Sequence, residues 1–170
     1  MGDPQESDVP LLVEQLGSAD ADRRAEAAEL LCRMGETAGS AAVDLVRACG
    51  DDDERVREWA VAALEGIGRP TTGATPRLAE FVGGKNPLCG YWAATLLGRA
   101  GQDAATAVGL LAAGVEAAAD PAVRQRAAWA LGKIGPAAAG AVEVLRRAAA
   151  QGQDPRLARL AQEAIGSIGG

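Results

Sequence analysis

The sequence of 170 residues predicts an all-α solenoid of five tandem helix–turn–helix repeats. Three observations predict this fold class. A glycine recurs at a near-constant interval, apolar residues ahead of it keep a helical spacing, and helix-capping residues recur at a fixed distance before it. The closing glycines are 33 or 34 residues apart: Gly35, Gly68, Gly101, Gly135 and Gly169. One helix pair cannot bury both of its faces, so such repeats are expected to stack on their neighbours.

The second helix of each repeat is predicted from the residues that precede its closing glycine. Apolar residues stand 12, 8, 5, 4 and 1 positions before the glycine, which places them on one helical face. The alternation that strands require is absent. The position eight residues before the glycine is alanine in every repeat: Ala27, Ala60, Ala93, Ala127 and Ala161.

The boundaries of these second helices are predicted independently by capping residues. Proline follows the cap in three repeats, where the first helical position tolerates it. The closing glycine suits the residue after the helix, where φ is often positive. Fifteen positions before each glycine stands a residue that caps helices well: Asp20, Asp53, Asn86, Asp120 and Asp154.

The first helix of each pair is predicted from a shorter apolar segment ahead of each second helix. These segments are Val9–Leu16, Ala42–Cys49, Arg77–Val82, Val108–Val115 and Ala141–Ala149. The predicted repeats therefore span about residues 8–35, 42–68, 76–101, 108–135 and 141–169. We expect one repeat domain over residues 1–170, with residues 1–7 as a flexible N-terminus.

Composition argues against several classes of partner. The chain has 17 basic and 23 acidic residues and a net charge of -6, so it lacks the basic bias typical of nucleic-acid binding. No apolar run is long enough to span a membrane, and the polar start does not resemble a secretory signal. Three cysteines, Cys32, Cys49 and Cys89, have no metal-ligand spacing, which favours a reducing, cytoplasmic location.

Two segments resemble a known repeat family. Asp120–Leu145 resembles a HEAT repeat of the short, phycobilisome-lyase-like kind, and Asp52–Gly68 is nearly as similar. The resemblance extends over residues 8 to 170. It implies a HEAT/armadillo-like, right-handed α–α superhelix whose second helices line the concave side. It also implies a structural role for the arginine 11 positions before the glycine, where it contacts acidic or carbonyl groups: Arg24, Arg57 and Arg124.

Some repeats depart from this family pattern. Arg23 replaces the apolar residue 12 positions before the glycine in the first repeat. Gly90 and Ala158 replace the arginine in the third and fifth repeats, and Ala100 replaces an isoleucine in the third. End repeats are usually atypical, whereas the departures in the third repeat indicate a looser or bent pair.

Aromatic residues are scarce, at 3% of the chain, and four of them lie off the core face of second helices. Trp59 and Trp92 stand nine positions before their glycines, Tyr91 ten and Trp129 six. Tryptophan and tyrosine are common at binding hot spots. One interpretation is a ladder across the concave face that binds an extended peptide or a flat ligand. The other is that Trp59 and Trp92 fill gaps between neighbouring helices.

The same face carries basic residues in its C-terminal half. Arg99, Arg126 and Lys133 are candidate contacts for an acidic peptide or a phosphate group. The alternative is a solvated helix face of mixed charge.

The sequence predicts no enzyme and no cofactor. Without any histidine, Ser/His and Cys/His nucleophiles and histidine metal ligands are excluded. The leading hypothesis is a non-catalytic scaffold that binds a protein or peptide. The alternatives are an accessory or ligand-handling subunit similar to chromophore lyase HEAT proteins, a DNA-lesion reader, and a structural homo-oligomer that associates through its end repeats.

Overall fold

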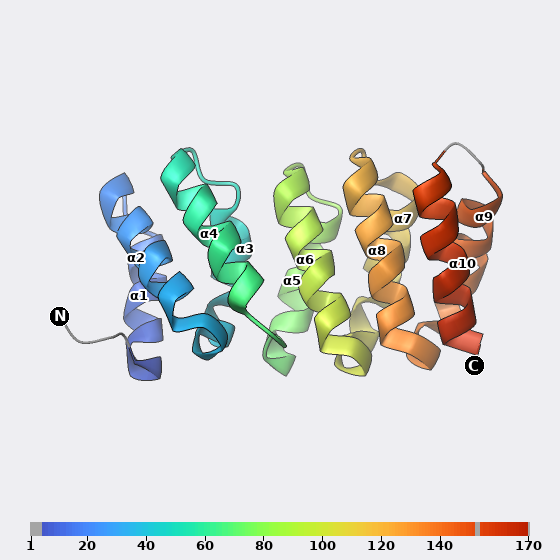
Figure 1. Cartoon of the computed structure of the whole chain (residues 1–170), viewed down its shortest axis with the longest axis horizontal. Helices are drawn as coiled ribbons and strands as arrows, with labels where there is room; N and C mark the ends of the chain where they lie inside the picture. The colour runs from blue at the N-terminus through green and yellow to red at the C-terminus, as the bar shows by residue number, and fades with distance from the viewer. Residues whose placement is uncertain (1–4, 152–153, 170) are drawn as a thin grey trace. The chain divides into compact units, whose positions relative to one another are not determined.

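The computed structural model describes residues 5–151 and 154–169, and within these residues the regular structure is helical, without strands (Figure 1). Residues 1–4 of the predicted flexible N-terminus lie outside the described residues, and Glu6–Asp8 form a 3-10 turn. The first helices of the pairs are α1 (Val9–Leu16), α3 (Ala42–Ala48), α5 (Thr75–Val82), α7 (Val108–Ala117) and α9 (Val142–Ala150). The second helices are α2 (Ala21–Met34), α4 (Glu54–Gly66), α6 (Pro87–Ala100), α8 (Pro121–Ile134) and α10 (Pro155–Gly169).

All five predicted N-caps are confirmed. In each, a side-chain oxygen accepts a hydrogen bond from a backbone N–H of the first helical turn, at 2.7 to 2.9 Å. These bonds satisfy donors that the helix itself leaves without a partner. The first residue of every second helix is therefore fixed by its own local sequence.

The predicted positive φ of the closing glycine is confirmed at three of the five helix ends. Gly35, Gly101 and Gly135 have φ values of 56°, 61° and 70°. At each, a 3-10 segment of seven residues then leads into the next first helix. The prediction is wrong at Gly68 and Gly169, because α4 already ends at Gly66 and α10 continues through Gly169.

The different end of α4 has a local cause. Ile67 leaves the helix with an extended backbone, at φ -73° and ψ 121°, and is itself buried. Pro70 follows two residues after Gly68, and a proline disfavours the helical conformation at the residue before it, here Arg69. A long 3-10 segment therefore does not form there, and only Thr72–Ala74 make a short 3-10 turn.

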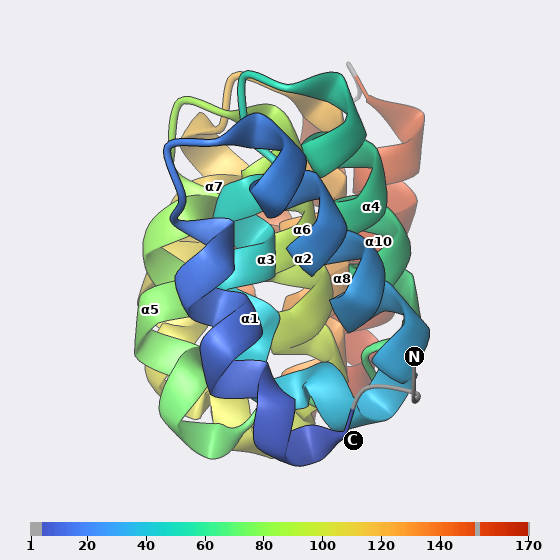
Figure 2. The same cartoon turned by 90° about the vertical axis from the view of Figure 1, so that its left-hand side faces the viewer.

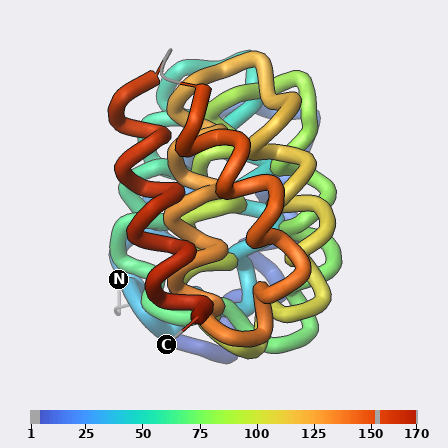
Figure 3. Tube along the Cα trace, turned by 90° about the vertical axis from the view of Figure 1, so that its right-hand side faces the viewer, coloured from blue at the N-terminus to red at the C-terminus, as the bar shows by residue number. Residues whose placement is uncertain are grey.

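The chain divides at this point into two compact units, Met1–Ala74 (unit 1) and Thr75–Gly170 (unit 2). The prediction of one domain over residues 1–170 stays a prediction. In unit 1, α1 packs on α2 and α2 packs on α4; Figure 2 shows the α1–α2 pair in front. In unit 2, the second helices α6, α8 and α10 pack in order, with α5, α7 and α9 as the other layer. Figure 3 shows α9 beside α10.

The core lies between the two layers of each unit and follows the predicted columns. The alanine eight positions before each glycine is completely buried in all five repeats. A methyl group there lets neighbouring helices approach closely, as interior packing requires. The residue four positions before the glycine is also completely buried in the first four repeats, where it is leucine, and half-buried in the fifth, at Ile165.

The structural role expected for the arginine column is confirmed. Arg24 donates to both carboxylate oxygens of Asp51, each at 2.8 Å, and to the carbonyls of Ser18 and Ala19. Arg57 donates to the carbonyls of Asp51 and Asp52, at 2.7 and 2.9 Å. These bonds tie the start of each second helix to the turn that precedes it or to the next repeat.

The fourth repeat follows the same arginine pattern, and the third replaces it by close packing. Arg124 donates from Nε to the carbonyl of Val115 at 2.9 Å. Gly90 stands in this column in the third repeat, where a Cβ would lie 3.2 Å from the Phe81 carbonyl oxygen. Glycine therefore lets α6 lie directly against the end of α5.

Candidate functional site

The candidate site lies on the second-helix face of unit 2, where aromatic rings and cations from neighbouring helices meet. Six of the seven residues predicted from the sequence belong to it, and we call them the aromatic–cation cluster: Tyr91, Trp92, Arg99, Arg126, Trp129 and Lys133. The seventh, Trp59, belongs to unit 1, where its side chain is 37% exposed on α4.

The α6 part of the cluster consists of two consecutive aromatic residues. The Tyr91 and Trp92 ring centroids are 5.8 Å apart and the ring planes meet at 88°, an edge-to-face arrangement. Trp92 is only 7% exposed, and the Arg99 guanidinium lies 5.9 Å from its ring centroid. Tyr91 is half-buried. Trp92 thus offers little surface to a partner and mainly supports its neighbours.

The Trp129 indole of α8 rests on a glycine of α6. A Cβ placed on Gly98 would lie 2.2 Å from Cζ3 of Trp129, far closer than two carbons can approach. Only glycine therefore leaves room for the ring in this position. The indole remains half-buried, with the edge of its six-membered ring against Gly98 of the neighbouring helix.

Arg126 joins the two aromatic groups. It lies three residues before Trp129, so both side chains project from the same face of α8. Its guanidinium lies 4.5 Å from the Tyr91 ring centroid and 5.0 Å from that of Trp129, and it donates a hydrogen bond to the Tyr91 hydroxyl. Lys133, four residues after Trp129, places its Nζ 5.8 Å from the indole centroid. Both cations lie within the range at which aromatic rings attract them.

Two adjoining pockets between α8 and α10 border this cluster, and together we call them the α8–α10 groove. The first, of about 250 Å³, is lined by Trp129, Gly132, Lys133, Leu160, Glu163, Ala164 and Ser167. The second, of about 200 Å³, is lined by Tyr91, Ala122, Gln125, Arg126, Trp129, Arg156 and Leu160. Trp129 and Leu160 border both pockets, so the two pockets adjoin at these residues.

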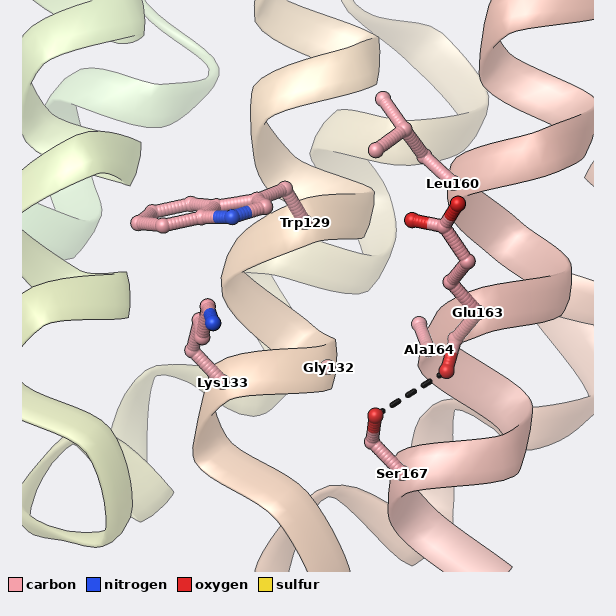
Figure 4. A pocket seen from close by; sticks show the side chains of 7 residues that line it. All are labelled: Trp129, Gly132, Lys133, Leu160, Glu163, Ala164 and Ser167. Atoms are coloured by element: carbon pink, nitrogen blue, oxygen red, sulfur yellow. Dashed lines mark hydrogen bonds between the residues drawn. The ribbon is translucent and has the colours of Figure 1, made fainter.

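Small residues form the floor of this groove. A Cβ on Gly132 would lie only 3.0 Å from Cα of Ala164, so α8 and α10 are in close contact there. Figure 4 shows Leu160 and Glu163 directed from α10 toward α8, and the Trp129 indole directed from α8 toward α6. Gly132 and Ala164, which have little or no side chain, form the floor at this contact, and the larger side chains form the walls of the groove.

The acidic groups near the groove are engaged by other residues. Glu163 forms an ion pair with Arg159 one turn earlier on α10, at 2.6 Å, and its backbone carbonyl accepts from the Ser167 hydroxyl (Figure 4). The N-cap Asp154 accepts from Gln125 Nε2 at 2.8 Å, and this hydrogen bond is the main reason that the pKa of Asp154 is lowered.

The groove is also lined by three residues that were not predicted from the sequence: Gln125, Arg156 and Leu160. Leu160 stands nine positions before its glycine, the same column as Trp59 and Trp92, so the repeat alignment contained a signal for it. Arg156 lies in the first turn of α10, between the N-cap column and the first apolar column, and periodicity gave no reason to select it.

The described part of the chain has no metal-binding cluster, and its cysteines are buried or half-buried. Within that part, no cluster of three or more His, Cys, Asp or Glu side chains could hold a metal ion. Cys49 and Cys89 are buried, Cys32 is half-buried, and burial raises the pKa of the Cys32 and Cys89 thiols, which disfavours the reactive thiolate. Within the same residues, no helix is both long enough and apolar enough to cross a membrane.

Stacked helix pairs with a groove between successive second helices define the chain as an α-helical repeat protein of the solenoid class. The model of HEAT repeats matches residues 9–87 and 75–166, which together cover most of the chain. The chain therefore belongs to the HEAT-repeat family. No curated protein matches it significantly.

Several solved structures share this fold. An engineered protein has a TM-score of 0.64 at 24% identity, with 96% of this chain and 80% of that chain covered. A designed armadillo repeat protein in complex with the peptide (KR)4 has a TM-score of 0.66 at 18% identity, over 98% and 87%. The complex of CpcE and CpcF of phycocyanin lyase from Nostoc sp. PCC7120 gives 0.61 at 17% identity, over 94% and 99%. At these identities the likeness is one of fold.

Proposed function

We propose that this chain is a non-catalytic scaffold that binds a protein or an extended peptide on the second-helix face of unit 2. The observation that carries the proposal is the position of Trp129. Its indole is half-buried beside Arg126 and Lys133, and the residue borders both pockets of the α8–α10 groove. Tryptophan, tyrosine and arginine are the residue types that most often dominate binding energy at interfaces.

The cluster residues have different roles in this proposal. Tyr91, Arg126, Trp129 and Lys133 contact the partner, because they border the pockets. Trp92 is buried, and with Arg99 it holds Tyr91 in place. Trp59 is an exposed aromatic residue of unit 1, and in the proposal it is a separate contact. A continuous aromatic ladder from Trp59 to the cluster of unit 2 stays a prediction.

The size of the pockets favours a peptide over a large planar ligand. Their volumes of about 250 and 200 Å³ lie below the range of roughly 300–1,000 Å³ that is typical of small-molecule sites. Each can hold a side chain, and because they adjoin, an extended chain can place side chains from one of its faces in both. The designed armadillo neighbour, which was solved with a peptide, supports this binding mode for the fold.

A displayed library of random peptides, selected on the purified protein, tests the proposal. We expect selected peptides to lose binding to the Trp129→Ala variant, with its helical circular dichroism retained. Leu110→Ser is the matched control, because Leu110 is 48% exposed on the first helix α7. Peptides that bind Trp129→Ala normally but not Leu110→Ser would place the binding surface on the other layer and contradict the proposal.

A further inference from the structure

The α8–α10 groove carries positive charge in a chain whose net charge is -6. Arg126, Arg156 and Lys133 line its two pockets. Among the described residues, no ion pair joins any of the three to a carboxylate. The one carboxylate in the lining, Glu163, is paired with Arg159. A cationic groove on an acidic protein is a specific feature of this face, since the composition of the whole chain does not produce it.

Arg126 is already oriented for an anion. Its guanidinium is held by the Tyr91 hydroxyl and lies near both the Tyr91 and the Trp129 rings. A guanidinium has five N–H donors, so one hydrogen bond to Tyr91 leaves others for a ligand. Because the side chain is already ordered, binding costs little of its rotamer entropy. Arg156 faces the same pocket from α10 and is exposed.

We propose that the α8–α10 groove binds an acidic peptide segment, with carboxylates held by Arg126 and Arg156 at one end and by Lys133 at the other. This inference rests on the proposed function and names the chemistry of the partner. Trp129 and Leu160 border both pockets, so an apolar side chain of the peptide packs between the two charged ends.

The spacing of the cations predicts the spacing of the acids. Arg126 and Lys133 are seven residues apart on α8, which is about 10 Å along the helix axis. An extended peptide advances about 3.3 Å per residue and presents alternate residues on one face. Acidic residues at the first and fifth positions of a segment lie about 13 Å apart on one face of the peptide. The long glutamate and Lys133 side chains span the difference of about 3 Å, so such a segment, with leucine at the third position, fits the groove. A single phosphate group would use only one of the two pockets.

Fluorescence anisotropy with synthetic peptides tests this proposal. The probe is a fluorescein-labelled peptide with Glu-Gly-Leu-Gly-Glu at its centre, and the comparison peptide has glutamine in place of both glutamates. We expect the acidic peptide to bind, the glutamine peptide to bind at least about tenfold more weakly, and rising salt to weaken the acidic peptide selectively.

Charge variants locate the site. Arg126→Gln and Arg156→Gln are each expected to weaken binding of the acidic peptide about tenfold. Arg156 is exposed, so its variant keeps the inference testable if Arg126→Gln lowers the melting temperature. Arg146→Gln is the matched control: it removes the same charge from α9, where Arg146 is 62% exposed and paired with Glu143. We expect it to change affinity less than about twofold.

Four outcomes would overturn the inference. The first two are a loss of affinity in Arg146→Gln as large as in the groove variants, and binding of the glutamine peptide as tight as that of the acidic peptide. The other two are no binding of the acidic peptide, and binding only when phosphoserine replaces the glutamates. These outcomes are distinct from failure of the proposed function. If library peptides without acidic residues bind and depend on Trp129, the face is a peptide site with different chemistry. If no library peptide depends on Trp129, the proposed function itself is wrong.

Discussion

Replacing Gly98 by alanine should destabilise unit 2 through a single contact. Gly98 lies in α6 under the Trp129 indole, and a Cβ there would lie 2.2, 2.8 and 2.9 Å from Cζ3, Cε3 and Cη2 of the ring. Carbon atoms do not approach so closely, so the indole has to leave its position. Because the ring is large and half-buried, its contacts with α6 are lost when it moves.

Two opposing effects determine the magnitude. Alanine is about 1 kcal/mol more favourable than glycine in a helix interior. Overpacking of a well-fitted contact costs about 1–3 kcal/mol. The net prediction for Gly98→Ala is a destabilisation of up to about 2 kcal/mol. Without the indole the steric cost disappears, so in a Trp129→Ala background the same change should stabilise by about 1 kcal/mol.

Chemical denaturation of the four proteins of this double-mutant cycle measures the effect, with tryptophan fluorescence and circular dichroism as probes. The expected coupling between the two sites is about 1–3 kcal/mol. Gly166→Ala in α10 is the matched control, because nothing lies within 4 Å of a Cβ at that position. It should be neutral or slightly stabilising.

The sign of the stability change that Gly98→Ala causes in each background is the critical observation. If Gly98→Ala stabilises the wild-type protein as much as it stabilises the Trp129→Ala variant, the indole does not depend on Gly98 for its position. The indole would then not rest on α6, and the aromatic–cation cluster would be held in place by other contacts.

Two further predictions concern the tryptophans and the arginine column. Trp92→Ala should cost about 3–5 kcal/mol because the side chain is 7% exposed. Trp59→Ala, at 37% exposure, should cost much less; equal losses in thermal melting would contradict this. Arg24→Gln should cost about 1.5–3 kcal/mol at neutral pH. Part of this cost should disappear in acid, because hydrogen bonds from Arg24 lower the pKa of Asp51. The resulting stability is present above about pH 4 and is lost as the pH falls through the lowered value. Denaturation of Arg24→Gln and of the wild type at neutral pH and in acid measures this, with Arg23→Gln as an exposed control. If the stability difference between Arg24→Gln and the wild type is the same at both pH values, Asp51 is not involved.

The helix boundaries could be predicted from the sequence because local chemistry determines them. Each N-cap needs only its own side chain and the next turn, and all five were found. The failure at Gly68 was also local: Pro70 constrains the residue before it, and repeat alignment alone ignores this constraint. The division into two units at Ala74 follows the same irregular connection.

Side-chain exposure in the candidate site could not be predicted in the same way. Trp59 and Trp92 occupy the same column of the repeat, yet they are 37% and 7% exposed. This column lies at the edge of the buried face, so exposure depends on which neighbours cover it. Tyr91 and Arg99, which contact the Trp92 ring, lie on the same helix α6. The cover of the ring by other helices is what the period of one helix does not describe.

One signal in the sequence does connect the repeats to the groove. Three positions before the closing glycine stand Gly98, Gly132 and Gly166, one in each repeat of unit 2, whereas unit 1 has Cys32 and Glu65 there. Each glycine inside a helix costs about 1 kcal/mol relative to alanine, so such a column calls for a packing reason. Gly98 makes room for the Trp129 indole, and Gly132 lets α8 approach Ala164. The glycines of α6 and α8 therefore lower local helix stability and set the position of the ring and the floor of the groove. The glycines that stand three residues before the end of a repeat therefore help to place the side chains that we propose as contacts for a partner.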